Sequence, residues 1–505
     1  MRETRSDTLP VMDALIAFRA RAKCPPPERP RRIVRAAAAF AAAIFTLAAI
    51  LISTGLATGT VVGAADNGDG SRLYCGAGLA PATPGGNSAW LGGVVLHFVP
   101  AARCPDPYPS LAQVLLDVVG TGSGADLRVL GALYALVFTA VAACAGWVAT
   151  SRGVRRAVLL VPVIMPLWDS AFTRMLISTF SEPVGLLAAF TVACGIAAAV
   201  TRPVGWDRAL MLGLLAVGAI GAAWAKPAYA PLALVAAAAA ALSGGRRAWR
   251  ASVATAAGIG VVSGALFIHL SSLQTRHYAA INSHNLVYTL ALTEMPGSAP
   301  ALGLPAAAQN AAGRAYYPAG PEGVPGADVV AAAPGAVRNR VLVELAEHPA
   351  AMVRALSVAV QATAGRELSY LPSRAWSPGM SPTPLGQTTG EQAADAAQLR
   401  TWLAGLPAPW WPGTVLIAGC VVGLVGLRRG HTLGLRAARL AGATAVAGLG
   451  LSAAALADGY FEIAKHVWLA AYMVDVTAWV LVVAGAAGVW TMCRRARTSP
   501  VRPQE

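Results

Sequence analysis

The stretch "RAAAAFAAAIFTLAAILISTGLA", residues 35–57, decides the fold class of this chain. After Arg35 it contains no charged side chain, and it exceeds the run of about 20 apolar residues with which a helix crosses roughly 30 Å of hydrocarbon. Residues 1–34 before it are polar and basic and contain several prolines. Such a segment is too long and too charged for an ordinary signal peptide, so the sequence predicts a cytosolic tail followed by an uncleaved transmembrane helix.

The composition of the whole chain agrees with a membrane location. The 505 residues are 56% hydrophobic and only 12% charged, with a mean hydropathy of +0.56, whereas an ordinary soluble protein is about 25% charged. The net charge of +15 could suggest a nucleic-acid partner. Basic membrane proteins, however, carry the same excess in their cytoplasmic loops. We therefore expect the lipid bilayer as a partner and no nucleic acid.

Further apolar runs predict an all-α polytopic integral membrane protein with about ten transmembrane helices and additional helices on its outer surface. The expected spans are residues 35–57, 128–149, 156–168, 183–201, 208–224, 227–243, 251–270, 412–427, 437–457 and 466–490. The run at 156–168 is short and contains Pro162 and Pro166, so a broken or partly embedded helix is expected there.

The connections between the expected spans alternate in charge. One set is basic and is predicted to be cytoplasmic: residues 151–156, 201–208, 244–250, 427–439 and the C-terminal tail. The other set faces outward and consists of 58–127, 169–182, the turn at Lys226, 271–411 and 458–466. The resulting organisation is a cytosolic tail (1–34), an N-terminal membrane region (35–270) that includes the first outer loop (58–127), a large extracytoplasmic segment (271–411), C-terminal transmembrane helices (412–490) and a cytosolic tail (491–505). The predicted location is the cytoplasmic membrane, with both termini in the cytosol.

Acidic side chains gather in the outward set of connections, and within the expected spans the only carboxylate is Asp475. An ion-coupled transporter usually needs ionisable groups near the middle of the bilayer. The distribution favours a reaction at the outer interface, with a glycan or lipid transporter or flippase as the alternative. A non-catalytic protein of cell-envelope assembly, in which the acids only cap helices, is a third hypothesis.

The segment "DNGDGSR", residues 66–72, directly follows the first span. Gly68 and Gly70 would let the backbone turn closely around a ligand, Asp69 could act as a general base, and Arg72 could bind a phosphate. Taken alone, the motif favours a plainer interpretation, a polar turn that ends a helix. Its predicted location on the outer face of the membrane, together with other charged residues, favours a catalytic site. Asp69 is the first candidate for the general base and Asp66 is the second.

Other candidates come from several outer connections. Glu182 could be catalytic or could only cap the helix that follows it. Lys226 could bind a phosphate or could extend to the membrane interface. Asp458, Glu462 and His466 have the spacing i, i+4, i+8, which predicts one face of the last helix as it begins. The predicted substrate-binding residues are Arg72, Arg174, Lys226, His284, Asn285, Glu462 and His466.

Cys75 and Cys104 both fall in the first outer loop, where an oxidising compartment would allow a disulfide between them. No cysteine supports a metal site. The outer acids could still hold Mg²⁺ or Mn²⁺, and the sequence does not decide whether a metal is used.

The order of short motifs along the chain resembles that of a known family. The motifs are "DNGDGSR" after the first span, "FSEP", "KPAY", "NLVYTLALTEMPGSAPALGLP", "AGRAYY", "EHPAAMVRAL", "YLPS" and "DGYFEIAKHVWL". They resemble the bacterial glycan biosynthesis hexose transferases, which are polytopic GT-C glycosyltransferases.

The resemblance implies an enzyme that takes a hexose from a polyprenyl-phosphate donor and adds it to a glycan acceptor outside the cytoplasmic membrane. In that fold an acid of the first outer loop is generally the catalytic base, which corresponds to Asp69, with Asp66 next. The chain differs from the expected pattern after the second Asp, where Gly70 stands in place of a bulky apolar or aromatic residue.

Overall fold

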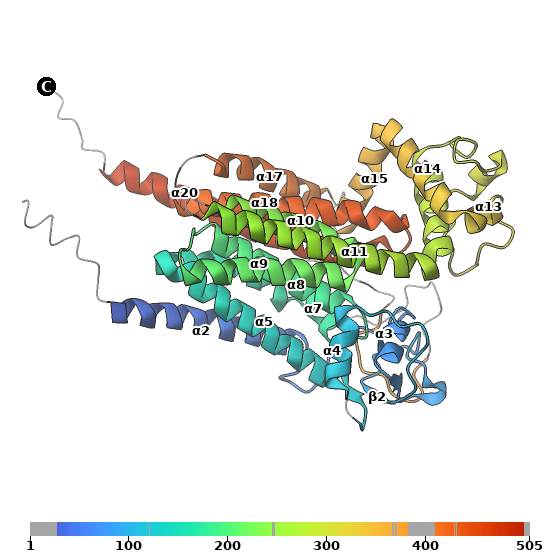
Figure 1. Cartoon of the computed structure of the whole chain (residues 1–505), viewed down its shortest axis with the longest axis horizontal. Coiled ribbons are helices and arrows are strands. Elements are labelled where there is room, and N and C mark those ends of the chain that lie inside the picture. Colours follow the sequence, from blue (N-terminus) through green and yellow to red (C-terminus); the bar gives the residue numbers. More distant parts are fainter. Residues whose placement is uncertain are drawn as a thin grey trace, which may run out of the picture.

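The computed structural model describes residues 28–120, 122–244, 248–365, 368, 371–381, 410–428, 430 and 432–498. Long helices lie side by side along the longest axis of the molecule, and the short helices and strands gather at one end of this bundle (Figure 1). The helix α2 (Glu28–Ser53) begins, and α20 (Trp468–Thr498) ends, at the opposite end of the bundle.

The bundle confirms the prediction of an all-α polytopic membrane protein. In the described chain, seven helices are long and apolar enough to cross a membrane. They are built on α2, α5 (Leu127–Ala149), α8 (Glu182–Ala199), α9 (Trp206–Ala225), α11 (Trp249–Asn285), α18 (Leu433–Ala455) and α20, in some cases with the adjoining helical turns. The helices α10 (Ala230–Leu242) and α17 (Trp411–Gly426) pack beside them but are shorter. Of the ten predicted spans, seven correspond to the long helices, two to the shorter α10 and α17, and one to a bent pair of helical segments that would raise the number to eight.

The bent segment lies at the expected span 156–168. The helical turns over Val154–Trp168 and those over Ser170–Leu176 meet at 72°, which confirms the predicted break. Two aromatic side chains of α20 form hydrogen bonds to the backbone of this segment. Trp468 donates from Nε1 to the Ala171 carbonyl (2.9 Å), and Tyr472 donates from its hydroxyl to the Val163 carbonyl (2.9 Å). The break thus packs into the core of the bundle. The turn that follows it, before α8, lies at the end of the bundle where the short helices and strands gather.

Small residues set the closest helix contact in the C-terminal half. Gly419 and Gly423 lie four residues apart on α17 and face α18, an arrangement that lets membrane helices approach closely. A Cβ atom at Gly423 would lie only 2.5 Å from the Cα atom of Gly442. This contact leaves no space for a side chain and holds the short helix α17 against the bundle.

The connection predicted to be the first outer loop forms a small folded unit at one end of the bundle. It contains α3 (Ser71–Gly76), α4 (Leu111–Val119) and an antiparallel sheet in the order β1 (Leu79–Pro81), β2 (His97–Pro100) and β3 (Ala125–Asp126). The expected cysteine pair, Cys75 and Cys104, is joined in a disulfide with its Cα atoms 5.3 Å apart. This bond ties α3 to the loop that follows β2.

The second unit at this end is an extension of α11. The helix α11 continues past residue 270, where the sequence analysis ended the N-terminal membrane region, to Asn285 and then through the π-helix η7 (Leu286–Ala291) and α12 (Leu292–Glu294). The helices α13 (Ala327–Ala332), α14 (Pro334–Glu347) and α15 (Pro349–Ala362) pack around this extension. The extension therefore carries side chains of the membrane helix up to the outer unit.

The first and last long helices extend into the segments predicted as tails. The helix α2 begins at Glu28, inside the predicted tail 1–34, and α20 extends to Thr498, inside the predicted tail 491–505. Residues 1–27 and 499–505, together with 382–409 of the large outer segment, lie outside the described residues.

The contact between α17 and α18 gives a direct test of the packing. We expect Gly423→Leu to lower the melting temperature of the detergent-purified protein, because overpacking of a tight contact costs about 1–3 kcal/mol. The matched control is Gly264→Leu in α11, where a Cβ atom meets nothing within 4 Å. Equal melting temperatures for the two variants would contradict this packing.

Candidate functional site

A cavity of about 620 Å³ opens where the bundle meets the outer units. Its walls come from the first outer loop, the start of α8, the turn between α9 and α10, the extension of α11 and the segment before α20. Seven of the predicted site residues line it: Asp69, Arg72, Glu182, Lys226, Asn285, Glu462 and His466. Residues that are far apart in the sequence therefore share one charged space.

Asp66 builds the turn that presents Asp69 to this cavity. Its Oδ1 accepts hydrogen bonds from the backbone N–H groups of Gly68 (2.8 Å) and Gly70 (3.0 Å), and its Oδ2 accepts one from the Ser88 hydroxyl (2.8 Å). Burial raises the pKa of Asp66, although these donors partly offset the effect. Asp66 is 6% exposed and does not line the cavity, so its place is structural and not that of a second catalytic base.

The structure explains the glycine that departs from the family pattern. Gly70 lies against the end of the turn before α8, where a Cβ atom would come within 2.1 Å of Thr179 Oγ1 and 2.9 Å of Asp66 Oδ2. A bulky residue at position 70 does not fit between these groups. Gly70 thus lets the DNGDG turn lie directly on the chain that leads to Glu182.

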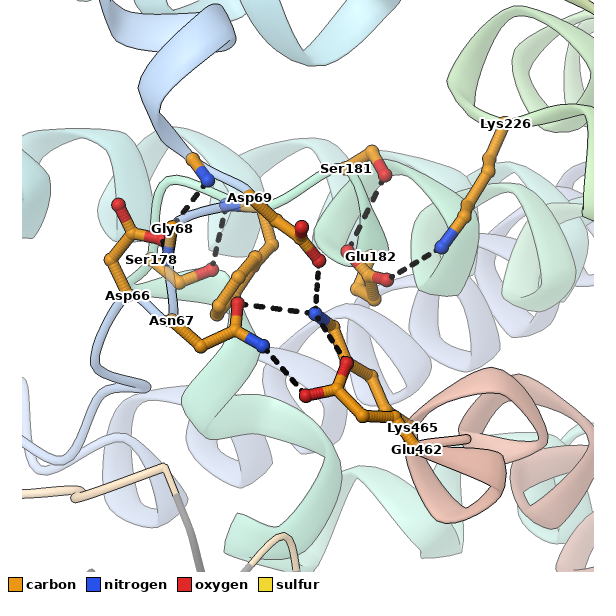
Figure 2. Close-up of polar contacts among 12 residues, drawn as sticks. Asp66, Asn67, Gly68, Asp69, Ser178, Ser181, Glu182, Lys226, Glu462 and Lys465 are labelled. Carbon is orange, nitrogen blue, oxygen red and sulfur yellow. Dashed lines mark hydrogen bonds and ion pairs between the residues drawn. The ribbon is translucent and has the colours of Figure 1, made fainter. Parts of the chain in front are cut away.

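A lysine that the sequence analysis missed lies at the centre of the charged residues. Figure 2 shows the Lys465 ammonium between Asp69, Asn67 and Glu462. It forms an ion pair with Asp69 Oδ2, donates to Asn67 Oδ1 (3.2 Å) and lies 3.6 Å from Glu462 Oε2. The side chain of Lys465 is 1% exposed, whereas that of Asp69 is 53% exposed, and Asp69 lines the cavity. The buried Lys465 ammonium therefore compensates the charge of the Asp69 carboxylate from the protein interior. The side of the carboxylate that faces the cavity is open to a ligand.

This arrangement sets the protonation state of Asp69. Removal from bulk water would raise the pKa of the carboxyl, but the Lys465 ammonium outweighs that effect and holds the pKa below its usual range. Asp69 is therefore ionised at neutral pH. Asn67 completes the arrangement by donating from Nδ2 to Glu462 Oε1 (3.0 Å).

A second ion pair lies on another wall of the cavity. Lys226 Nζ donates to Glu182 Oε1 at 3.4 Å, and Glu182 is 3% exposed at the first position of α8. Burial would lower the pKa of Lys226, but the Glu182 carboxylate outweighs it and raises the pKa. Lys226 thus lines the cavity in its charged form, paired with Glu182.

Arg72 lines the cavity with a donor that has no internal partner. Its Nε and Nη2 donate to the carbonyls of Asp106 (3.2 Å) and Pro107 (3.4 Å), and its guanidinium lies 5.7 Å from the ring centres of Tyr108 and Tyr278. Its Nη1 is buried and has no hydrogen-bond partner among the described residues. The held guanidinium therefore places a fixed positive charge on the cavity wall, where it can attract an anionic ligand.

The segment from Asp458 to His466 does not form the single helical face expected from its spacing. The chain turns at Gly459 (φ 68°) and at Glu462 (φ 49°), and only Ile463–His466 forms the short helix α19. A Cβ atom at Gly459 would lie 2.4 Å from the Asn285 carbonyl oxygen, so the turn fits closely against the end of α11. Asp458, Glu462 and His466 still reach the same cavity, but through a folded loop. Burial lowers the pKa of His466, which keeps its imidazole neutral at pH 7.

Two predicted binding residues lie outside the cavity. Arg174 is 2% exposed and donates to the carbonyls of Leu371 (3.2 Å) and Leu368 (3.3 Å) and to Ser373 Oγ (2.7 Å). It holds the segment around residue 371 to the bundle and is not available for a lipid phosphate. His284 is also 2% exposed, and its ring packs on those of Tyr288 and Tyr316 with centres 4.5 and 5.5 Å apart.

The described residues do not provide a metal site. They contain no group of three or more His, Cys, Asp or Glu side chains that could hold a metal ion. The carboxylates of Asp69 and Glu182 are already matched by lysines.

These observations define a class of protein: a helical, multi-pass membrane protein with a charged cavity at one end of its bundle. The chain belongs to the family described as the YfdI N-terminal transmembrane domain, whose model matches residues 30–502. Comparisons with curated proteins and with solved structures find no match.

The ion pair of Asp69 and Lys465 predicts a pH dependence of stability. A carboxyl with a lowered pKa stabilises the folded state above its unfolded pKa of about 3.9, and this contribution is lost as the pH falls through the lower, folded value. We expect Asp69→Asn to lower the melting temperature by a similar amount from pH 8 to pH 5, with the difference from wild type shrinking below pH 4.

Asp117→Asn is the control for this measurement, because Asp117 pairs on the surface with Arg103, whose side chain is 65% exposed. Exposed pairs contribute only about 0–1 kcal/mol, so this variant should melt close to wild type. A difference between Asp69→Asn and wild type that grows as the pH falls from 5 to 3 would contradict the assigned protonation state.

Proposed function

We propose that this chain is a membrane glycosyltransferase of the GT-C type. It moves a hexose from a polyprenyl-phosphate donor to a glycan acceptor of the cell envelope at the outer face of the cytoplasmic membrane. The observation that carries the proposal is the cavity in which an ionised Asp69, open on one side, shares its walls with Arg72 and Lys226.

The position of the cavity suits a lipid-linked donor. The cavity lies where α8 begins and where α9 ends, at the level at which apolar helices give way to polar loops. A polyprenyl chain would remain in the hydrocarbon while its phosphate lies at headgroup depth. Lys226 pairs with Glu182 and Lys465 with Asp69, and Arg72 adds a further cation on the cavity wall, so the donor phosphate would lie beside Arg72 and Lys226.

The proposed reaction is a single displacement at the anomeric carbon of the donor sugar. An acceptor hydroxyl oxygen forms the new glycosidic bond as the bond between the anomeric carbon and the phosphate oxygen breaks. The hydroxyl proton passes to the Asp69 carboxylate, and the electron pair of the broken bond leaves on the polyprenyl phosphate. Arg72 and Lys226 stabilise the charge that develops on that phosphate.

Lys465 is a positioning residue in this proposal. It is buried below Asp69 and does not line the cavity. By fixing Asp69, Asn67 and Glu462 it orients the base, and it keeps the carboxylate ionised before the acceptor arrives. The neutral His466 and the amide of Asn285 add hydrogen-bonding groups on the cavity wall that can contact sugar hydroxyls.

The competing hypotheses expect different arrangements. A transporter or flippase would need ionisable residues along a path through the bundle, whereas the charged residues that line the cavity lie together at one end of it. In a non-catalytic assembly protein, Asp69 would only cap a helix. In fact, Asp69 makes no capping hydrogen bond to α3, whose N-cap residue is Gly70. The arrangement therefore supports the enzyme over both alternatives.

Hexose transfer in membranes tests the proposal. Membranes that contain the wild-type protein are supplied with radiolabelled polyprenyl-phosphate hexoses, and label in envelope glycan is measured. We expect Asp69→Asn to reduce the rate at least about 100-fold, the usual minimum contribution of a general base. The control Asp117→Asn, outside the cavity, should retain the wild-type rate. Equal transfer by correctly inserted Asp69→Asn and wild type would remove Asp69 from the mechanism.

A further inference from the structure

The end of the bundle opposite the cavity contains a buried arginine that forms no ion pair with any residue that the structure describes. Arg436 lies in the first turn of α18 and is 5% exposed. Its Nε and Nη1 are buried, and neither has a hydrogen-bond partner among the described residues. A buried guanidinium that lacks acceptors loses its hydration without compensation. A bound anion would supply the missing acceptors and the opposite charge.

Other arginines lie at the same end of the bundle: Arg152 and Arg156 follow α5, Arg202 follows α8, and Arg439 lies one turn further along α18. The positive charges of all four act on Arg436. The acid at the start of α9, Asp207, is already engaged in an ion pair with Arg35 of α2. The N-terminus of α18 adds the positive end of its helix dipole at the same place. The local field is therefore strongly positive.

Two of these arginines have a structural explanation. Arg156 donates from Nη1 to the Thr201 carbonyl (3.0 Å) at the end of α8, and Arg439 donates from Nε to the Gly426 carbonyl (2.6 Å) at the end of α17. Both satisfy the last carbonyls of a helix. Among the described residues, no backbone carbonyl accepts a hydrogen bond from Nε or Nη1 of Arg436.

Arg202 adds an independent sign of a function. It follows α8 in a left-handed backbone conformation, with φ 56°, and its side chain is exposed. Glycine usually occupies this position after a helix because it has no Cβ atom. An arginine there accepts backbone strain, which is typical of residues kept for their side chains.

We propose that Arg436 and Arg202 form the centre of a binding site for a phosphate group, which we call the arginine site. The site lies at the opposite end of the bundle from the cavity and does not depend on the proposed enzymatic activity. Basic pockets between membrane helices bind the headgroups of anionic phospholipids. The exposed Trp206 (74%) and Leu427 (68%) at this end fit contact with lipid.

Thermal shift titrations test the arginine site. The purified full-length protein in neutral detergent is melted with increasing phosphatidylglycerol, with zwitterionic phosphatidylcholine, or with inorganic phosphate. We expect phosphatidylglycerol to raise the melting temperature, with a half-saturating amount about fivefold higher in Arg436→Gln and in Arg202→Gln, since each arginine near such a surface contributes about 1 kcal/mol. Arg338→Gln, on α14 at the cavity end, is the matched control and should respond like wild type.

The outcomes separate the sources of the phosphate. A response to phosphatidylglycerol but not to inorganic phosphate identifies a lipid headgroup, and a response to both that weakens in the same variants identifies a free phosphate site. If Arg436→Gln does not fold, the exposed Arg202→Gln decides alone. Wild-type responses in the two arginine variants, or equal stabilisation by phosphatidylcholine, would overturn the proposal.

Discussion

The buried ammonium of Lys465 is the interaction on which the rest of the cavity depends. A buried lysine must find acceptors, because an unpaired charge inside a protein is strongly unfavourable. Its acceptors Asn67 and Asp69 are almost 400 residues earlier in the chain and follow the first membrane helix. The bundle must therefore bring the exit of α2 and the entry of α20 to the same end, and the DNGDG turn must lie against the segment before α20.

The two ends of the bundle carry different charge arrangements. At the cavity end, lysines pair with carboxylates, and Asp69 and Arg72 both line the cavity. At the other end lie the buried Arg436 and several other arginines whose charges act on it. This asymmetry agrees with the basic connections of the sequence lying at one end and the acidic connections at the other, the pattern from which a cytosolic and an outer face were predicted.

The fold and the site could be predicted to different extents from the sequence. Apolar length located the long helices because hydrocarbon thickness fixes it, but it did not separate the spans from the shorter helices α10 and α17. Acids near helix ends led to Asp69, Glu182 and Glu462, which do share the cavity. Lys465 was missed, although "EIAKH" placed it between two candidates, because only tertiary contacts distinguish a buried lysine from a snorkelling one. The positions of Asp66 and Arg174 likewise depend on backbone groups that no local pattern specifies.

The central claim is that a lipid-linked sugar enters the cavity beside Asp69. The most direct measurement uses a polyprenyl-phosphate hexose that carries a photoreactive group on the sugar, cross-linked to the wild-type protein in membranes and mapped by mass spectrometry of its peptides. The account predicts labelling of peptides that contain residues 66–76 and 458–466, with competition by the unmodified donor. Competable labelling confined to the middle of the membrane helices, with none at these segments, would contradict it.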